Sequence, residues 1–289
     1  MIQLLAPLVT PFASDESLDR AAFIKNLKKY DDAPLDGYLI NGTSGEAEML
    51  SSSERVELVK FAIDNTDRTV IAGLASTSVQ AGLAELEQLG ALNLKAVLIR
   101  TPSYYGGQLD QIAYFHAMAD YSRHPIMIYQ IPQCTGLKLT GQELREISQH
   151  PNVVGVKDSQ GDLAMLNEVS WPSRFRYFLG ASAVIQPGLA AGAHGGILAL
   201  ANVVPELCRE LLDLSADPTR VVQARSLQQK LIPLNRLLGG SRGFGIAGLK
   251  AACDMRGYSG GPPRRPLRGL NDAQRKELDR VLRETLRCD

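Results

Sequence analysis

Lys157 is the residue whose position in the sequence points most directly to chemistry. It directly follows the apolar run VVGV at 153–156 instead of lying on the polar face of a helix. An unprotonated lysine amine can attack a ketone carbon to form a Schiff base, and an apolar pocket that excludes water favours that neutral amine. A lysine at a strand end can equally extend to solvent or pair with the adjacent Asp158. The position alone therefore leaves both interpretations open.

Two further segments carry groups that would complement such an amine. Tyr129 ends the apolar run at 125–129, and its phenol can donate to and accept from a substrate oxygen. The loop at 42–45 (GTSG) combines the hydroxyls of Thr43 and Ser44 with backbone N–H groups that could bind a carboxylate. The alternatives are a core aromatic at 129 and a plain tight turn at 42–45.

The elements that must position these residues are short apolar runs of the kind that form strands buried on both faces, separated by amphipathic helical patterns. Ser51 and Glu54 form a capping-box signature at the start of one helix. Eight strand–helix units of about 27 residues each suit an α/β fold, the closed parallel (β/α)8 barrel, whose active sites lie at the carboxyl ends of the strands. An open doubly wound sheet would need a glycine-rich fingerprint after the first strand, where VTPFAS stands. The expected strands are 2–10, 36–40, 69–74, 95–100, 125–129, 152–156, 176–180 and 195–200.

Strand-like runs end near residue 219, so we expect a catalytic barrel at 1–219 and a domain of three helices at 220–289. The second part holds fifteen Lys and Arg against six Asp and Glu, although the whole chain has a formal charge of +0. We interpret this asymmetry as two parts that face each other, with solvated faces of mixed helices as the alternative. A nucleic-acid surface is disfavoured, because no basic tract is interleaved with aromatics. The loop GGSRGFG lacks a Lys-Ser/Thr ending, which favours a helix–helix connection over a phosphate loop.

The composition is that of an ordinary globular chain, with 289 residues, 45% hydrophobic and 21% charged. Four separated cysteines without a CxxC pair, and four histidines without an HxH or HExxH pair, predict no metal site and a cytoplasmic location. The N-terminus has no cationic start and is a poor signal peptide. The uncharged stretch 177–205 is interrupted by glycines, Pro187 and His194, which favours a buried helix followed by a buried strand over a membrane helix.

Five motifs in order resemble the dihydrodipicolinate synthase / N-acetylneuraminate lyase family of class I aldolases. The resemblance runs from TPF at 10–12 to the C-terminal helices. It implies a (β/α)8 barrel with a helical C-terminal domain, a homotetramer or homodimer, and a reaction on pyruvate or another 2-oxo acid without a cofactor. The motifs are GTSGE (42–46), TPSYYGG (101–107), YQIPQCTG (129–136), VVGVKDS (153–159) and GGILALAN (195–202).

The resemblance also implies roles for individual residues. Lys157 matches the Schiff-base lysine, and Tyr129 matches the tyrosine that moves protons beside it. Thr43 and Ser44 match the pair that holds the carboxylate of the 2-oxo acid and relays protons. Tyr104 matches the relay tyrosine that reaches the site of a neighbouring subunit.

Other positions of the motifs bear on the substrate. Ile197 matches a position whose backbone faces bound pyruvate. Dihydrodipicolinate synthases usually carry an arginine before the TG of the YNxPxRTG motif, where it receives the carboxylate of the aldehyde. Here Cys134 occupies that place and Gln130 replaces the Asn. A thiol cannot replace a bidentate guanidinium. The segments TPSYYGG, VGVKDSQGD, GGILALANV and FGIAGLKAACDMRGYSGGPPRRPL are more similar to 4-hydroxy-2-oxoglutarate aldolases, whose serine after the KD pair is here Ser159.

We therefore predict a Schiff-base lyase that releases pyruvate and glyoxylate from 4-hydroxy-2-oxoglutarate. The first alternative is dihydrodipicolinate synthase, which condenses pyruvate with aspartate semialdehyde. A 2-keto-3-deoxygluconate aldolase and a non-catalytic sensor that binds a 2-oxo acid remain open as well. A phosphate-sugar barrel enzyme is disfavoured, because the loops after strands seven and eight carry no cation.

Overall fold

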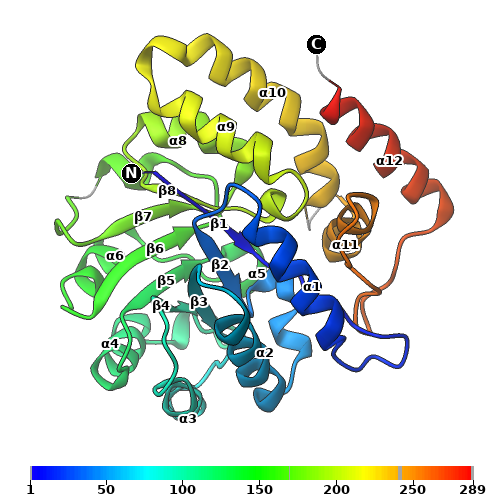
Figure 1. Cartoon of the computed structure of the whole chain (residues 1–289). Coiled ribbons are helices and arrows are strands. Elements are labelled where there is room, and N and C mark those ends of the chain that lie inside the picture. Colours follow the sequence, from blue (N-terminus) through cyan, green and yellow to red (C-terminus); the bar gives the residue numbers. More distant parts are fainter. Residues whose placement is uncertain (1, 169, 240–242, 288–289) are drawn as a thin grey trace.

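A closed barrel of eight parallel strands forms the centre of the computed structural model, which describes residues 2–168, 170–239 and 243–287 (Figure 1). The strands pair in chain order, and the last pairs with the first, so no strand edge is left open. The predicted number and order of strands are confirmed. The strands are β1 (Gln3–Pro7), β2 (Gly37–Ile40), β3 (Thr69–Leu74), β4 (Ala96–Arg100), β5 (Ile126–Gln130), β6 (Val153–Asp158), β7 (Arg176–Leu179) and β8 (Gly195–Ile197).

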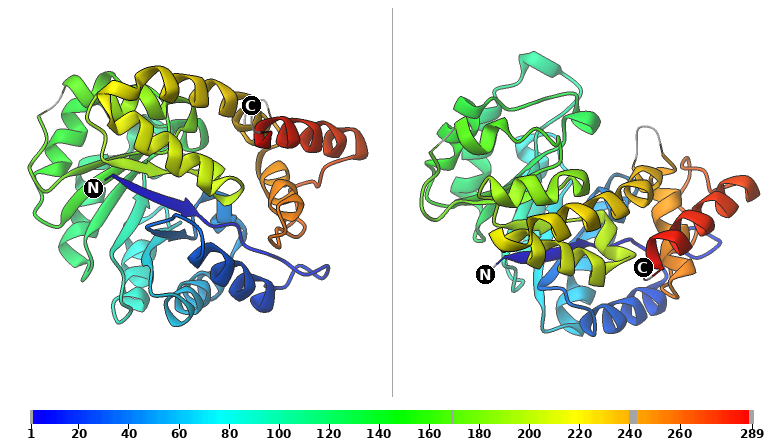
Figure 2. Two further views of the ribbon diagram at one scale, coloured as in Figure 1. Left: turned by 45° about the horizontal axis from the view of Figure 1, so that its top comes forward. Right: turned by 90° about the horizontal axis from the view of Figure 1, so that it is seen from above.

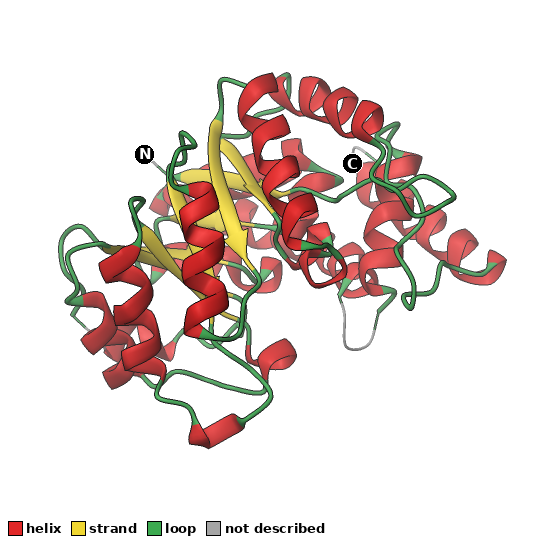
Figure 3. Ribbon diagram, turned by 90° about the horizontal axis from the view of Figure 1, so that it is seen from below, coloured by secondary structure: helices red, strands yellow, loops and turns green. Residues whose placement is uncertain are grey.

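Helices surround the barrel, as the view coloured by secondary structure shows (Figure 3). The predicted capping box is present at α2, where Ser51 Oγ accepts from Glu54 N at 3.2 Å and Glu54 Oε2 accepts from Ser51 N at 2.8 Å. The helices that follow strands are α1 (Arg20–Asp31), α2 (Ser52–Asn65), α3 (Val79–Leu89), α4 (Gln111–Tyr121), α5 (Pro132–Thr135), α6 (Gly141–Ser148), α7 (Ala164–Glu168), α8 (Ile185–Ala190) and α9 (Pro205–Ala216).

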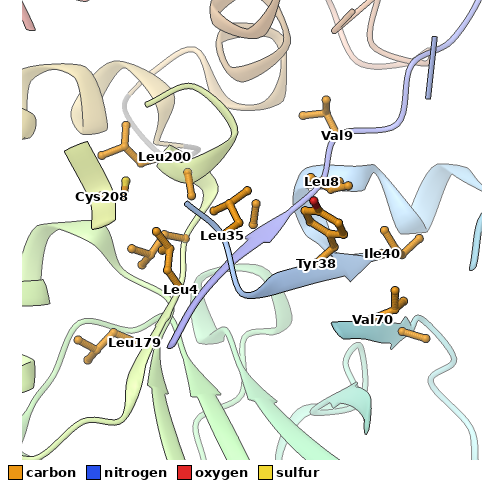
Figure 4. Packing of buried hydrophobic residues seen from close by; sticks show 14 of the residues in the cluster. Leu4, Leu8, Val9, Leu35, Tyr38, Ile40, Val70, Leu179, Leu200 and Cys208 are labelled. Carbon is orange, nitrogen blue, oxygen red and sulfur yellow. The ribbon is translucent and has the colours of Figure 1, made fainter. Parts of the chain in front are cut away.

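Alternate strand residues point to two separate cores. The inward residues, such as Leu39, Leu98 and Phe178, fill the barrel, while their neighbours face the helices. Figure 4 shows part of the outer layer, in which Leu4 and Tyr38 pack beneath the helices together with Cys208 of α9. Burying a large apolar side chain stabilises the fold by about 1.5–3 kcal/mol. The alternation therefore decides which strand residues can reach the interior of the barrel.

The uncharged stretch 177–205 forms β7, the short helix α8, β8 and a 3-10 helix, η5 (Ala199–Asn202). The predicted buried helix followed by a buried strand is confirmed. Ile185 of α8 and Ile197 of β8 are both fully buried. Within the described ranges, no helix combines the length and the apolar character needed to cross a membrane.

Three further helices, α10 (Val221–Leu238), α11 (Gly245–Met255) and α12 (Asp272–Leu286), follow the barrel and gather at one side of it (Figure 2). The three predicted C-terminal helices are confirmed. The predicted helix–helix connection joins α10 to α11, although its residues 240–242 lie outside the described residues, as does Cys288. Since α10 packs along α8 and α9, the division of the chain at residue 219 stays a prediction.

Opposite charges meet between the barrel and these helices, as the sequence predicts. In the described part of the chain, four ion pairs each join an acidic residue of the first 219 positions to a basic residue of the last 70. Four of the fifteen basic residues of the C-terminal part are therefore paired with carboxylates of the first 219 residues. The pairs are Glu46–Lys250, Glu206–Arg256, Glu54–Arg264 and Glu16–Arg265.

Candidate active site

The register of adjacent strands places Tyr129 of β5 directly beside Lys157 of β6. Sequence reasoning places each residue at or just beyond the end of an apolar run. The structure corrects the strand ends, because β5 continues to Gln130 and β6 to Asp158. Both residues are thus held by strand hydrogen bonds instead of by a loop. Paired residues on parallel strands point to the same face, so Lys157 shares the barrel interior with Tyr129.

The side chain of Lys157 is buried against the ring of Tyr129. Only 4% of Lys157 is exposed, and its Nζ lies 4.2 Å from the centroid of that ring. Within residues 2–168, 170–239 and 243–287, no hydrogen bond or ion pair engages this nitrogen. The amine therefore faces the site without a competing partner, which is the condition that attack on a carbonyl carbon requires.

The alternative pairing of Lys157 with Asp158 is not found. Because successive strand residues point to opposite faces, Asp158 turns outward, where the hydroxyl of Tyr177 donates to its carboxylate. The backbone N–H and the side chain of Gln160 also donate to it, each at 2.9 Å. Burial raises the pKa of Asp158, while these hydrogen bonds oppose that rise. Asp158 is therefore part of the packing between β6 and β7.

The loop after β2 brings a hydroxyl to the phenol. The Thr43 Oγ1 atom lies 3.3 Å from the hydroxyl of Tyr129, and either group can be the donor. Thr43 begins a 3-10 turn, η1 (Thr43–Gly45), and Gly45 is required there because a Cβ would lie 2.9 Å from the carbonyl oxygen of Leu8. The hydroxyl of Thr10 also donates to Gly45 O at 2.7 Å. The close approach of the segment that follows β1 therefore sets the position of this turn.

A cavity of about 510 Å³ joins these groups at the carboxyl ends of the strands. Its volume lies in the range of small-molecule sites. The structure brings six of the seven predicted site residues to its wall, namely Lys157, Tyr129, Thr43, Ser44, Ile197 and Ser159.

Ser159, the residue after β6, lines this cavity where the ends of β6 and β7 lie close together. Its N–H donates to Gln130 O at 2.9 Å, which extends the pairing of β6 with β5 by one residue. A Cβ on Gly180, the residue after β7, would lie 2.0 Å from Ser159 Oγ, so a side chain there would force the serine hydroxyl to move. The missing side chain at 180 leaves room for the serine hydroxyl.

Tyr104 is the predicted residue that the single chain does not bring to the site. It is 92% exposed and has φ of +82°, a left-handed conformation that a bulky residue rarely adopts. Its ring meets that of Tyr105 edge-on at 5.2 Å between centroids. Tyr104 therefore does not line the cavity of Lys157 in this chain.

Sequence reasoning missed the contribution of the C-terminal helices to the cavity. Asn235 of α10, with Ile246 and Leu249 of α11, lines its wall opposite the strand ends. The motif around FGIAGLK resembles that of aldolases, but no periodicity indicates which face of α11 covers the barrel. The helices added after the barrel are thus part of the site.

A second cavity of about 370 Å³ adjoins the first and shares Thr43, Tyr129 and Cys134 with it. Arg100 and Glu48, which sequence reasoning did not select, line this second space. Cys134 is exposed at this wall, and partial desolvation raises the pKa of its thiol, which brings no positive charge to the cavity.

Gln130, the other departure from the YNxPxRTG motif, lies away from both cavities. It is fully buried on the outer face of β5, where its Oε1 accepts from Leu139 N at 2.9 Å. Its exchange for the usual Asn therefore concerns the packing beneath the helices. In the described part of the chain, no cluster of three or more His, Cys, Asp or Glu could hold a metal ion.

These groups together suit Schiff-base chemistry on a 2-oxo acid. They are the buried amine of Lys157, the phenol of Tyr129, and the turn η1, whose backbone N–H groups and Thr43 and Ser44 hydroxyls could bind a carboxylate. The model of the Dihydrodipicolinate synthetase family matches residues 1–285. The chain belongs to this family. Members of the dihydrodipicolinate synthetase family are Schiff-base-forming lyases, so the chain is an enzyme of that class.

Relatives in the dihydrodipicolinate synthetase family match the chain over nearly its full length. An uncharacterized DapA-like lyase of Halobacterium salinarum is 33% identical over 282 residues, which cover 96% of this chain and 91% of that protein. The 4-hydroxy-tetrahydrodipicolinate synthase 2 of Streptomyces coelicolor is 30% identical over 280 residues, 96% of this chain and 92% of that protein.

Solved structures support the same assignment. A putative dihydrodipicolinate synthase from Thermus thermophilus is 31% identical, with a TM-score of 0.87 over 97% of each chain. The dihydrodipicolinate synthase DapA-2 of Bacillus anthracis is 24% identical, with a TM-score of 0.92 over 98% of this chain and 97% of that one. The latter likeness shows the shared fold, and the predicted (β/α)8 barrel is confirmed.

Proposed function

We propose that this lyase is a class I aldolase that cleaves 4-hydroxy-2-oxoglutarate into pyruvate and glyoxylate. The single observation that carries the proposal is the buried Nζ of Lys157, which lies over the ring of Tyr129 and has no partner among the described residues. An amine that no carboxylate or backbone carbonyl of the described residues engages is available to bond to the ketone carbon of a substrate.

In the proposed reaction, Lys157 Nζ attacks C2 of the 2-oxo acid, and loss of water leaves an iminium ion. The 4-hydroxyl group then loses its proton, the C3–C4 bond breaks, and its electron pair moves into the enamine. Glyoxylate leaves, the enamine is protonated at C3, and hydrolysis of the iminium releases pyruvate. Tyr129 and Thr43, 3.3 Å apart at their hydroxyls, form the proton relay in this proposal.

The substrate carboxylate next to the ketone would bind at the turn that holds Ser44. Ser44 is buried in η1 and lines the same cavity as Lys157. Successive backbone N–H groups and hydroxyls at such a turn suit an anion. The backbone at Ile197 and the hydroxyl of Ser159 face the remaining wall, and we assign both to substrate positioning.

Dihydrodipicolinate synthase is the second candidate, because a relative at 30% identity bears the name 4-hydroxy-tetrahydrodipicolinate synthase 2. That reaction uses the same enamine to attack aspartate semialdehyde. Cys134 argues against it, since the position that usually provides a guanidinium here has a thiol with a raised pKa. We therefore rank cleavage of the hydroxylated 2-oxo acid first.

Reductive trapping tests the proposed chemistry. Borohydride added with pyruvate should leave a stable adduct on Lys157, located by peptide mass spectrometry. Turnover of 4-hydroxy-2-oxoglutarate and of aspartate semialdehyde with pyruvate is then measured side by side. A chain without an adduct contradicts the mechanism, whereas an adduct with strong preference for the semialdehyde contradicts only the substrate. Pyruvate binding without any cleavage across a panel of 2-oxo acids would favour a sensor.

We also propose that the working assembly is a homotetramer or a homodimer in which Tyr104 enters a neighbouring site. Its exposed, left-handed position beside the exposed Tyr105 supports this proposal. Two adjacent exposed tyrosines are typical of an interface. Light scattering of the purified chain gives the mass, and a monomer with full activity would contradict the role of Tyr104.

A further inference from the structure

We propose that Arg100 binds the distal carboxylate of a dicarboxylic 2-oxo acid, and that Glu48 occupies the guanidinium until the substrate replaces it. This inference rests on the proposed function and names the substrate class of the same site. Cys134 of α5 stands where a guanidinium would otherwise be expected, so a cation for the distal carboxylate has to come from another element.

Arg100 lies in the same layer of the barrel as the reactive lysine. In the register of the sheet, Arg100 of β4 pairs with Tyr129 of β5, and Tyr129 pairs with Lys157 of β6. Ala96 and Leu98, four and two residues before it, belong to the interior cluster, so alternation also turns Arg100 inward. The three side chains therefore stand in one row, with Tyr129 between the two nitrogenous groups.

The spacing of this row suits a short dicarboxylate. Two strand spacings separate the backbones of Arg100 and Lys157, about 10 Å in all. The second cavity contains Arg100 and shares Thr43, Tyr129 and Cys134 with the cavity of Lys157. A ligand bonded to Lys157 can thus extend past Tyr129 toward Arg100 within the two adjoining cavities.

The hydrogen bonds of Arg100 divide into fixed and exchangeable ones. Its Nη2 donates to Ala75 O at 3.0 Å, and its Nη1 donates to Thr101 O and Ser103 Oγ, each at 3.3 Å. Backbone carbonyl groups therefore hold the guanidinium in place. Its one carboxylate partner among the described residues is Glu48, whose Oε1 accepts from Nε at 3.0 Å and lies 2.9 Å from Nη2.

Burial differs sharply between these two partners. The side chain of Arg100 is 13% exposed, while that of Glu48 is 58% exposed. An ion pair with one exposed member contributes little to stability, so a carboxylate already anchored by a covalent bond can displace Glu48. A guanidinium binds a carboxylate through two parallel hydrogen bonds, which gives both strength and orientation. Glu48 therefore marks the place that the ligand carboxylate takes.

Asn41 adds a polar group to the same space. Its Nδ2 donates to Arg55 O at 2.8 Å, and its Oδ1 is buried with no partner among the described residues. Asn41 lines the second cavity together with Arg100. A buried acceptor without a donor is costly, and a hydroxyl group of the ligand would supply one.

The test compares a dicarboxylic with a monocarboxylic 2-oxo acid, because both can form the Schiff base while only one has a distal charge. The half-saturating concentrations of 2-oxoglutarate and of pyruvate are measured by borohydride trapping. Arg100→Met should raise the 2-oxoglutarate value by about 10- to 100-fold and change the pyruvate value by less than about 2-fold. Glu48→Gln should lower the 2-oxoglutarate value, because it removes the competing carboxylate.

Arg123→Met serves as the matched control, since Arg123 also pairs with a glutamate but lies on the exposed surface. It should leave both values unchanged. Equal changes for both acids in Arg100→Met, or no change for 2-oxoglutarate, would overturn the assignment of Arg100. If Arg100→Met does not fold, an unchanged or raised 2-oxoglutarate value in Glu48→Gln overturns it. A wild-type chain that traps neither acid contradicts the proposed function itself.

Discussion

Two lysines are buried among the described residues, Lys157 in the barrel and Lys250 on α11, and their surroundings differ in one respect. Each Nζ lies over an aromatic ring, 4.2 Å from the centroid of Tyr129 and 4.4 Å from that of Phe12. Lys250 is fully buried, and its three N–H groups donate to three acceptors at 2.6–2.8 Å. Lys157 has no such acceptor among the described residues. Burial is common to both, but only Lys157 is left available.

The acceptors of Lys250 connect α11 to the turn η1, which the proposed function assigns to the substrate carboxylate. They are Glu46 Oε1, Thr10 O and Pro262 O. Burial lowers the pKa of Lys250, and the carboxylate of Glu46 opposes that change. Glu46 directly follows η1 and has a left-handed φ of 57°. The comparison teaches that burial alone does not decide the role of a lysine. Three acceptors hold Lys250, whereas Lys157 has none among the described residues, as its proposed Schiff-base role needs.

Replacement of Lys157 should have the largest effect. Lys157→Met should abolish the borohydride adduct and all aldol cleavage, because no other described amine faces the cavity. The free energy of unfolding should change by less than about 1 kcal/mol, since no hydrogen bond of a described residue is lost. Mass spectrometry and urea unfolding check both points. A borohydride adduct on Lys250 in this variant would show that Lys250, and not Lys157, reacts with the ketone.

Replacement of Lys250 should act on stability instead. Lys250→Met leaves the carboxylate of Glu46 buried without its counter-ion, which should cost about 3–5 kcal/mol of unfolding free energy. Urea unfolding measures the loss. The double variant Lys250→Met with Glu46→Gln should recover part of it, because the uncompensated charge is gone. Equal stability of the single and double variants would contradict a charge-based explanation.

Removal of the Tyr129 hydroxyl should make the surroundings of Lys157 resemble those of Lys250. Tyr129→Phe keeps a ring beneath Lys157, as Phe12 lies beneath Lys250, but removes the hydroxyl that contacts Thr43. We expect the catalytic rate to fall by about 100-fold, or about 2.7 kcal/mol in activation free energy. Steady-state kinetics provides the measurement. Thr43→Val should act in the same direction, and an unchanged rate in Tyr129→Phe would contradict the relay.

The smallest effect is expected when low pH protonates Glu54, whose ion pair with Arg264 lies near the Lys250–Glu46 pair. Hydrogen bonds from Arg264 lower the pKa of Glu54 to about 2. A carboxyl group with a depressed pKa adds stability above its unfolded value of about 4.3, and this stability is lost as the pH falls toward about 2. Glu54→Gln should therefore cost about 1 kcal/mol or less at pH 7, and the difference from wild type should shrink between about pH 4.3 and about pH 2.

Urea unfolding at several pH values measures this difference for Glu54. Trapping of pyruvate at neutral pH should be the same in Glu54→Gln and in the wild type. A difference in unfolding free energy that stays constant down to about pH 2 would show that the pair contributes through packing alone. If Glu54→Gln lost the pyruvate adduct on Lys157, the ion pairs around Lys250 and the cavity of Lys157 would be coupled.

Much of the fold could be predicted because apolar runs and helical periodicity are local signals. All eight strands follow the predicted order, with ends shifted by a few residues, since hydrogen bonding with neighbours decides where a strand stops. Lys157 and Tyr129 could be selected because each adjoins such a run. Thr43 and Ser44 could be selected because their loop follows the carboxyl end of β2, where barrel active sites lie.

The sequence by itself determined the alternation that turns Lys157 inward and the opposite charges that join the barrel to its C-terminal helices. Only the tertiary structure decided which groups meet across strands. Arg100 lines a cavity beside Tyr129 because of its register on β4, and Lys250 is fixed because Glu46, Thr10 and Pro262 converge on it. Such contacts join segments far apart in the chain, and no local pattern encodes how a closed barrel brings them together.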